Sequence, residues 1–214
     1  MIRRNIEVEA RLIDDLLDVT GIMRGKLELN RQALDARPLF EHAMQNYCAG
    51  AATKKHLRVS IKVTATESHV LADSSRMTQV FWNLLQNACK FTPESGASDV
   101  RVYNEWPSPN DRDVRSEQPD LLVEISDTGI GISPENMPHI FKAFEQGERS
   151  RSRIFGGLGL GLAISRAIVE LHDGGITAIS EIKGKGARLS LGCTPSERRS
   201  KGSAISTLPE APLA

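Results

Sequence analysis

At 214 residues, of which 40% are apolar, the chain is long enough to bury one core and a small appendage. Lys plus Arg and Asp plus Glu both total 27, so the net charge gives no overall electrostatic attraction to an anionic membrane. For the same reason we expect no nucleic-acid partner. No apolar run approaches the roughly 20 residues of a membrane helix, and the start does not resemble a signal peptide, which predicts a cytoplasmic protein. The three cysteines, Cys48, Cys89 and Cys193, are widely spaced and are expected to be reduced packing or surface residues.

The first half of the chain changes from helical to strand periodicity. Apolar residues recur at helical spacing from Ile2 to about Met23, with a stripe wide enough for a helix bundle. This helix either packs on its own domain or forms half of a hairpin that pairs with another chain. A second helix is expected from about Pro38 to Lys55, with the proline in its first turn. Alternation from Leu57 to Val63 then predicts a strand with one buried face.

The second half of the chain is expected to mix helices and strands. Pro93 stops a predicted helix over Asp73–Phe91, and a polar loop follows at 105–120. A later helix begins near Leu160 and stops at Gly174-Gly175. The predicted strands are Asp99–Asn104, Leu121–Asp127, Ile176–Glu181 and Ala187–Leu191. After Pro195 the composition is typical of a disordered tail or linker.

The helix over Asp73–Phe91 carries three polar residues on one face. Asn83, Asn87 and Lys90 follow one another at spacings of four and three, while the leucines face the opposite way. Mg²⁺ binds oxygen ligands and keeps several waters, so the Asn87 amide oxygen can serve it when a nucleotide supplies the rest. Lys90 offers positive charge to phosphate oxygens. The face therefore suits a metal–phosphate site.

A carboxylate is expected at a sharp turn after the strand Leu121–Asp127. Asp127 is followed by Thr-Gly-Ile-Gly131, a sequence that favours a turn. A fixed carboxylate accepts a hydrogen bond from the exocyclic amine of adenine, worth roughly 1.5–3 kcal/mol. Asp127 could therefore select adenine over guanine.

A glycine run opens the last predicted helix. Gly156-Gly-Leu-Gly-Leu-Gly161 lets backbone N–H groups at the helix start cradle phosphate. Neither GxxxxGK[ST] nor GxGxxG occurs, which argues against a P-loop or Rossmann site. The preceding segment, Glu145–Phe155, has the length of a flexible lid, and its arginines either meet the γ-phosphate or are simply solvated. These arginines are Arg149, Arg151 and Arg153.

These motifs closely resemble the ATP-binding catalytic domain of sensor histidine kinases, in the GHKL ATPase superfamily, over about residues 30–192. Asn83–Pro93 resembles the N box, Asp127–Ile132 the first glycine box, Phe141–Phe144 the F box and Gly157–Gly161 the second glycine box. The resemblance implies a two-layer α/β sandwich of the Bergerat type, a mixed sheet with helices on one face, preceded by a bundle helix. The expected domains are 1–29, an incomplete dimerisation and histidine-phosphotransfer hairpin, 30–195, the catalytic domain, and 196–214, the tail.

The resemblance also implies a set of site residues for ATP and Mg²⁺. Catalytic roles are expected for Asn83, Asn87 and Lys90, with the metal on Asn87. The residues expected to bind nucleotide are Asn87, Lys90, Asp127, Gly129, Gly131, Phe144, Arg153, Gly157, Gly159, Leu160 and Gly161. Leu158 departs from the family, which often has a small hydroxyl residue there and so gains a phosphate hydrogen bond.

The implied activity is transfer of the γ-phosphoryl of Mg·ATP to a histidine in two-component signalling. The first helix resembles the second helix of the kinase hairpin, and none of the five histidines has the sequence context of the family's phosphoacceptor. We therefore expect a donor half that binds ATP and needs an acceptor from a histidine-phosphotransfer domain or a full-length kinase. The further partners expected are a response regulator and a second copy bound through the first helix. The alternatives are a GHKL-type ATPase, a protein-serine kinase and a non-catalytic module with a degenerate site.

Overall fold

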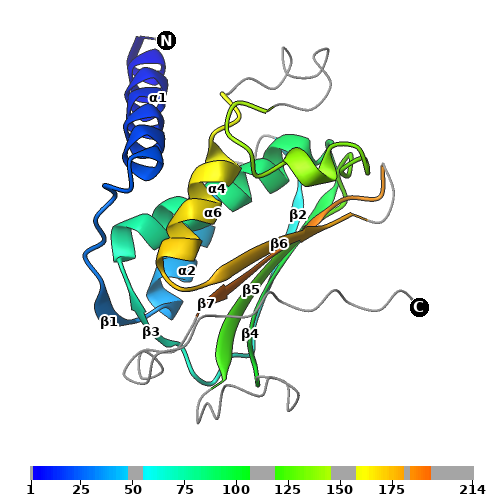
Figure 1. Cartoon of the computed structure of the whole chain (residues 1–214). Helices are drawn as coiled ribbons and strands as arrows, with labels where there is room; N and C mark the ends of the chain where they lie inside the picture. The colour runs from blue at the N-terminus through cyan, green and yellow to red at the C-terminus, as the bar shows by residue number, and fades with distance from the viewer. Residues whose placement is uncertain (1, 48–54, 107–118, 146–157, 181–183, 194–214) are drawn as a thin grey trace.

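The computed structural model describes residues 2–47, 55–106, 119–145, 158–180 and 184–193 (Figure 1). Its elements along the chain are α1 (Ile2–Met23), β1 (Gln32–Asp35), α2 (Arg37–Tyr47), β2 (Arg58–Val63), β3 (His69–Ala72), α4 (Ser74–Phe91), β4 (Ala97–Glu105), β5 (Asp120–Asp127), the 3₁₀ helix η2 (Met137–His139), α6 (Gly161–Leu171), β6 (Gly175–Ile179) and β7 (Arg188–Cys193).

A five-stranded mixed sheet forms one layer of the molecule. Its strand order is β2-β4-β5-β7-β6, in which β2 and β4 run parallel and the other neighbours are antiparallel. The helices α2, α4 and α6 lie together on one face of this sheet (Figure 1). The predicted two-layer α/β sandwich with a mixed sheet is confirmed.

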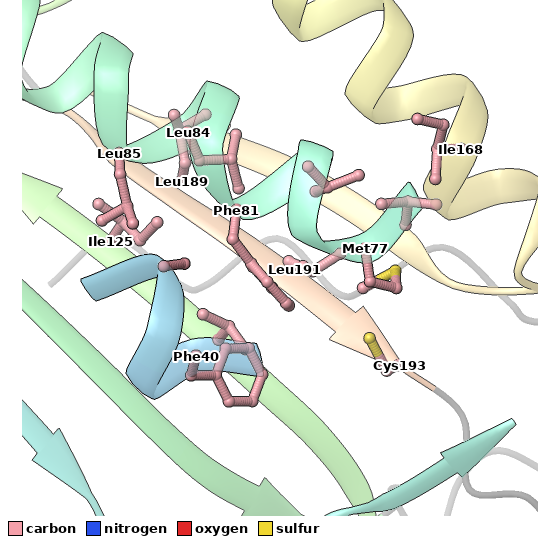
Figure 2. Packing of buried hydrophobic residues seen from close by; sticks show 14 of the residues in the cluster. Phe40, Met77, Phe81, Leu84, Leu85, Ile125, Ile168, Leu189, Leu191 and Cys193 are labelled. Carbon is pink, nitrogen blue, oxygen red and sulfur yellow. The ribbon is translucent and has the colours of Figure 1, made fainter. Parts of the chain in front are cut away.

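The core lies between the sheet and the three helices. Apolar residues of α4 meet the inward residues of the central strands, and the rings of Phe40 and Phe81 pack with their centroids 4.4 Å apart (Figure 2). Residues of α6 complete the layer because their apolar positions share one helix face. The largest fully buried side chains are Val80, Leu84, Leu85, Val102, Leu121, Val123, Leu160, Ile164, Ile168, Val169 and Leu191.

The start of α4 is fixed by the side chain of Asp73. Its Oδ1 accepts hydrogen bonds from the backbone N–H groups of Ser75 and Arg76 at 3.0 and 3.2 Å, as expected of a helix N-cap. Its Oδ2 accepts from the N–H of Asn30 at 3.0 Å. Burial alone would raise the pKa of Asp73, but hydrogen bonds from Ser75, Arg76 and Asn30 together lower it. The connection from α1 is thereby tied to the first turn of α4.

A buried histidine joins the end of α6 to the start of α4. The Nε2 of His172 accepts from the backbone N–H of Asp73 at 2.9 Å, and its Nδ1 lies 2.7 Å from the carbonyl oxygen of Ile168. Both contacts are satisfied by a neutral ring that carries its proton on Nδ1. Burial lowers the pKa of His172, which favours this neutral form.

The C-terminal half of α1 docks on α4 through a group that we call the Asp18 clasp, made of Asp18, Arg76 and Gln79. The two carboxylate oxygens of Asp18 accept hydrogen bonds from Arg76 Nη1 and Gln79 Nε2, each at 2.7 Å. Asp18 is only 7% exposed, and its neighbour Val19 belongs to the core. The opposite side of this half of α1 exposes Ile13, Leu16 and Leu17.

The structure also contains a small sheet that the sequence analysis did not anticipate. Strands β1 and β3 pair antiparallel, with Gln32 opposite Ala72 and Asp35 opposite His69. Each strand has four residues, which is too short for a clear period-two pattern. Most expected boundaries of the other elements agree with the structure to within two residues. The expected second half of the helix ending at Lys55 falls largely on residues 48–54, outside the described residues.

The prediction of one buried face for β2 is wrong in part. Val59 is half-buried, but Ile61 and Val63 are 48% and 46% exposed. The reason is that β2 lies at the edge of the sheet, with a single neighbouring strand. Cys193 is a buried packing residue as expected, and burial, aided by the charge of Asp120, raises the pKa of its thiol to about 12. No helix in the described part of the chain has the length and apolarity that crossing a membrane requires.

Candidate functional site

The predicted metal–phosphate residues lie on the last turns of α4. Asn87 is half-buried, and its side chain has no hydrogen-bond partner among the described residues, so its amide oxygen can meet a ligand. The Nζ of Lys90 lies 5.1 Å from the centroid of the Phe91 ring. Burial lowers the pKa of Lys90, because it disfavours the charged ammonium group. A bound phosphate would stabilise that charged form and offset the effect of burial.

Asn83 points toward α6. Its Nδ2 donates to the carbonyl oxygen of Gly161 at 3.2 Å and approaches the hydroxyl of Ser165 at 3.4 Å. A Cβ on Gly161 would lie 3.5 Å from the Asn83 amide carbon, an ordinary van der Waals contact. Asn83 therefore links α4 to α6, the helix that follows the glycine run, and helps to position it.

Asp127 stands at the end of β5 with its carboxylate held by the following turn. Its Oδ1 accepts from the N–H of Gly129 at 2.8 Å. Burial raises the pKa of Asp127, and hydrogen bonds from the backbone N–H groups of Gly129 and Ala187 offset part of that rise. Any side chain at Gly129 would clash, because a Cβ there would lie 2.5 Å from both Asp127 Oδ1 and the carbonyl oxygen of Phe91. The glycine lets the turn close over the end of α4.

Hydrogen bonds join the Asp127 turn to α4 and to the turn between β6 and β7. The N–H of Ile130 donates to the carbonyl oxygen of Phe91 at 3.2 Å, and Ile130 in turn accepts from Gly184 at 2.7 Å. The Ser180 hydroxyl accepts from the N–H of Ile132 at 2.9 Å and donates to the carbonyl oxygen of Gly186 at 2.7 Å. The structure thus brings the Asp127 turn against the end of α4, the helix that bears Asn87 and Lys90.

Gly184 and Gly186, in the turn after β6, were not predicted from the sequence as residues of the site. Gly186 has a φ of +85°, and a Cβ there would lie 1.7 Å from the carbonyl oxygen of Asp127. Gly184 also has a positive φ, +91°. The signal that could have found them is the pair Gly184-Lys-Gly186 between two predicted strands, since paired glycines there indicate a backbone constraint.

The first turn of α6 presents backbone N–H groups beside Asn83. Gly159 has a φ of +73°, and no side chain caps the helix at Leu160. Leu160 is 1% exposed, so its side chain belongs to the core and only its backbone can approach a phosphate. Gly131, on the Asp127 turn, also has a positive φ, +67°. Gly157, Arg153 and most of the expected lid lie outside the described residues.

The expected F box lies on the segment after η2. Phe141 is half-buried against the core, and the guanidinium carbon of Arg166 lies 5.7 Å from its ring centroid. Phe144 is 57% exposed and has a φ of +65°, in the left-handed region that costs a bulky residue conformational energy. Its contact with nucleotide stays a prediction.

This sandwich, with a carboxylate turn, an amide-bearing helix face and a glycine-opened helix at one end, defines an ATP-binding domain of the GHKL type. Residues 72–198 match the family described as histidine kinase-, DNA gyrase B- and HSP90-like ATPase. The chain belongs to this family.

The curated relatives are named as histidine kinases and sensor proteins. Hybrid signal transduction histidine kinase D of Dictyostelium discoideum is 33% identical over 211 residues, covering 89% of this chain and 14% of the relative. Aerobic respiration control sensor protein ArcB of Escherichia coli is 33% identical over 183 residues, covering 84% of this chain and 22% of ArcB. The chain therefore spans less than a quarter of the length of these relatives and corresponds to the ATP-binding catalytic part of a histidine kinase.

Solved structures of similar proteins share the fold. Full-length ShkA, crystallised in complex with AMPPNP, superposes with a TM-score of 0.69 at 25% identity, covering 89% of this chain and 36% of ShkA. The catalytic domain of histidine kinase ThkA gives a TM-score of 0.61 at 22% identity, covering 78% of this chain and 97% of that domain.

Proposed function

We propose that this chain binds Mg·ATP and transfers its γ-phosphoryl group to a histidine in two-component signalling. The observation that carries the proposal is the junction of the Asp127 turn with the end of α4, where Ile130 N–H binds the carbonyl oxygen of Phe91 at 3.2 Å. This junction holds a carboxylate suited to adenine close to the helix turn that bears Asn87 and Lys90. The family membership and the histidine kinase relatives support the same activity.

The residues present fit Mg²⁺. The metal would be held by the amide oxygen of Asn87, a hard ligand, together with nucleotide phosphates and water. The described residues contain no cluster of three or more His, Cys, Asp or Glu side chains that could hold a metal without a nucleotide. When bound, Mg²⁺ would neutralise phosphate charge.

The chain's own groups then bind and orient the nucleotide. Asp127 would accept a hydrogen bond from the adenine amine, and Lys90 would pair with phosphate oxygens. The N–H groups that open α6 would receive further phosphate oxygens with the favourable end of the helix dipole. Catalysis would come from positioning and charge neutralisation, with no covalent intermediate on this chain. Gly157, Gly159 and Gly161 would let backbone approach the phosphates.

The acceptor and the downstream partners are part of the proposal. A histidine-phosphotransfer domain or a full-length kinase would supply the histidine, and a response regulator would receive the phosphoryl group. The exposed apolar residues Ile13, Leu16 and Leu17 on α1 suit packing against another helix, including that of a second copy. The proposed location is the cytoplasm.

The test is incubation of the chain with γ-labelled Mg·ATP, with and without a supplied hairpin domain that contains an acceptor histidine. We expect acid-labile label on the added hairpin only. Asn87→Ala should abolish labelling, whereas Gln86→Ala, which changes an exposed neighbour on α4, should preserve it. Free phosphate released by the chain alone and lost in Asn87→Ala would instead make it an ATPase, and acid-stable label on a hydroxyl residue would make it a serine kinase.

A second measurement tests the adenine contact. Asp127→Asn replaces an acceptor-only group with one that also donates, so ATP affinity should fall by about tenfold or more. GTP affinity should not fall with it. Equal affinities of the wild type and Asp127→Asn for ATP would contradict the assigned role of Asp127.

A further inference from the structure

Lys55 binds the carboxyl-terminal end of α4. Its Nζ lies 2.8 Å from the carbonyl oxygen of Cys89, 3.1 Å from that of Lys90 and 3.0 Å from that of Thr92. The last carbonyl groups of a helix have no partner within the helix, and an ammonium group has three protons to donate. A single side chain therefore satisfies three carbonyl groups where α4 ends.

Backbone hydrogen bonds hold both Lys55 and the end of α4 in place around this contact. The backbone carbonyl oxygen of Lys55 accepts from the N–H of Ser95 at 3.0 Å, and Thr92 closes the helix by donating its N–H to Ala88 at 3.1 Å. The next carbonyl group, that of Phe91, binds the Asp127 turn through Ile130. Lys55 thus holds the backbone between the residue that would bind phosphate and the turn that would bind adenine.

The position of Lys55 also has an electrostatic consequence. The carboxyl-terminal end of a helix carries about half a negative charge, spread over its unpaired carbonyl groups. Asn87 and Lys90 stand in the last turns of α4, so a triphosphate bound there would approach this negative end. Burial already disfavours the charged form of Lys90. A second positive charge on the carbonyl groups would offset the repulsion.

We propose that Lys55 is a positioning residue of the nucleotide site, whose ammonium group neutralises the carbonyl end of α4 so that the phosphates of ATP can bind beside Asn87 and Lys90. This inference rests on the proposed ATP site. Lys55 itself touches backbone and acts through the helix end. Its contribution therefore grows with the number of phosphates on the ligand, whereas a purely structural helix cap would affect every ligand that uses the site alike.

The experiment compares the affinities of the full chain for ATP, ADP and adenosine by calorimetric titration. Lys55→Gln, which keeps a donor but removes the charge, should weaken ATP about tenfold, ADP less, and adenosine hardly at all. Lys55→Arg should recover most of the loss. Lys62→Gln, which removes an exposed lysine from β2, is the matched control and should leave all three affinities unchanged.

Two results would overturn the inference. An equal loss for ATP, ADP and adenosine in Lys55→Gln would reduce Lys55 to a structural cap, and no loss for any ligand would remove its role. Circular dichroism and thermal unfolding of each variant show whether it is folded, and Lys55→Arg repeats the comparison with the charge retained. If the wild-type chain itself fails to bind ATP, the proposed function fails first and the inference falls with it.

Discussion

The Asp18 clasp predicts how firmly α1 is held against the catalytic part. Asp18→Ala removes both hydrogen bonds at 2.7 Å, one from Arg76 and one from Gln79. The Asp18 side chain is 9% exposed and that of Arg76 27%, so water screens this pair less than a surface ion pair. Hydrogen bonds to a charged group contribute roughly 1.5–3 kcal/mol. We therefore expect the substitution to cost about 2 kcal/mol of docking free energy.

Native-state hydrogen exchange measures this cost where it arises. Local opening of the C-terminal half of α1 exposes its amides, and a loss of about 2 kcal/mol corresponds to roughly thirtyfold faster exchange there. Asp14→Ala is the matched control, because Asp14 lies on the same helix and is exposed. It should leave protection unchanged or raise it slightly, since alanine is the better helix former.

The reasoning has a clear point of failure. If Asp18→Ala and Asp14→Ala have the same effect on exchange in α1, the clasp does not hold the helix. A double-mutant cycle with Arg76→Ala adds a second criterion, because residues in direct contact should show a coupling energy of at least about 0.5 kcal/mol. Additive effects of the two substitutions would refute the contact even if each alone is destabilising.

The remaining predictions concern pH and the turn after β6. His172 has a pKa lowered by burial, so its contribution to stability is complete above its ordinary value of 6.5 and is lost as pH falls, when protonation breaks its bond from Asp73 N–H. As the pH is lowered from 8 to 5, the free energy of unfolding of the wild type should fall more steeply than that of His172→Gln, by up to about 1.4 kcal/mol per pH unit. An identical pH dependence of the two proteins would contradict this. Gly186→Ala should lower the free energy of unfolding, measured with denaturant, by about 3 kcal/mol or more, because the new Cβ would clash with the carbonyl oxygen of Asp127. Gly184→Ala has open space around it and should lower it by only about 1 kcal/mol, because of the positive φ. Equal losses in the two variants would refute the clash.

The large elements of the fold could be predicted because their periodicity is long and consistent. The predicted helix over Asp73–Phe91 agrees with α4 to within one residue, because its apolar residues recur at helical spacing and Pro93 marks its end. The predicted strands Asp99–Asn104 and Leu121–Asp127 agree with β4 and β5 to within two residues; burial alternates along β4, whereas five successive residues of β5 are buried. The order of the four motifs indicated the family, because four separated motifs in a fixed order are more specific than any one of them.

What escaped prediction depends on contacts between distant segments. The pairing of β1 with β3 joins strands too short to show a period, across more than thirty residues of chain. Ser180 carries no local signal for its two hydrogen bonds, which appear only when the turn after β6 packs on the Asp127 loop. Propensity describes a segment alone, and these features belong to pairs of segments.

The polar face of α4 shows why spacing alone assigns function incompletely. At about 100° per residue, Arg76, Gln79, Asn83, Asn87 and Lys90 all fall within a sector of roughly 80°, so the sequence presents one stripe. Packing divides it, because the first two residues face α1 through the Asp18 clasp and the third faces α6 through Gly161. Asn87 and Lys90 lie beyond these contacts, on the last turns of α4, about 12 Å along the helix from the clasp. In the proposed transfer the reacting atoms have to come within roughly 3 Å of each other, so a phosphoryl acceptor would have to reach these last turns of α4, away from the clasp.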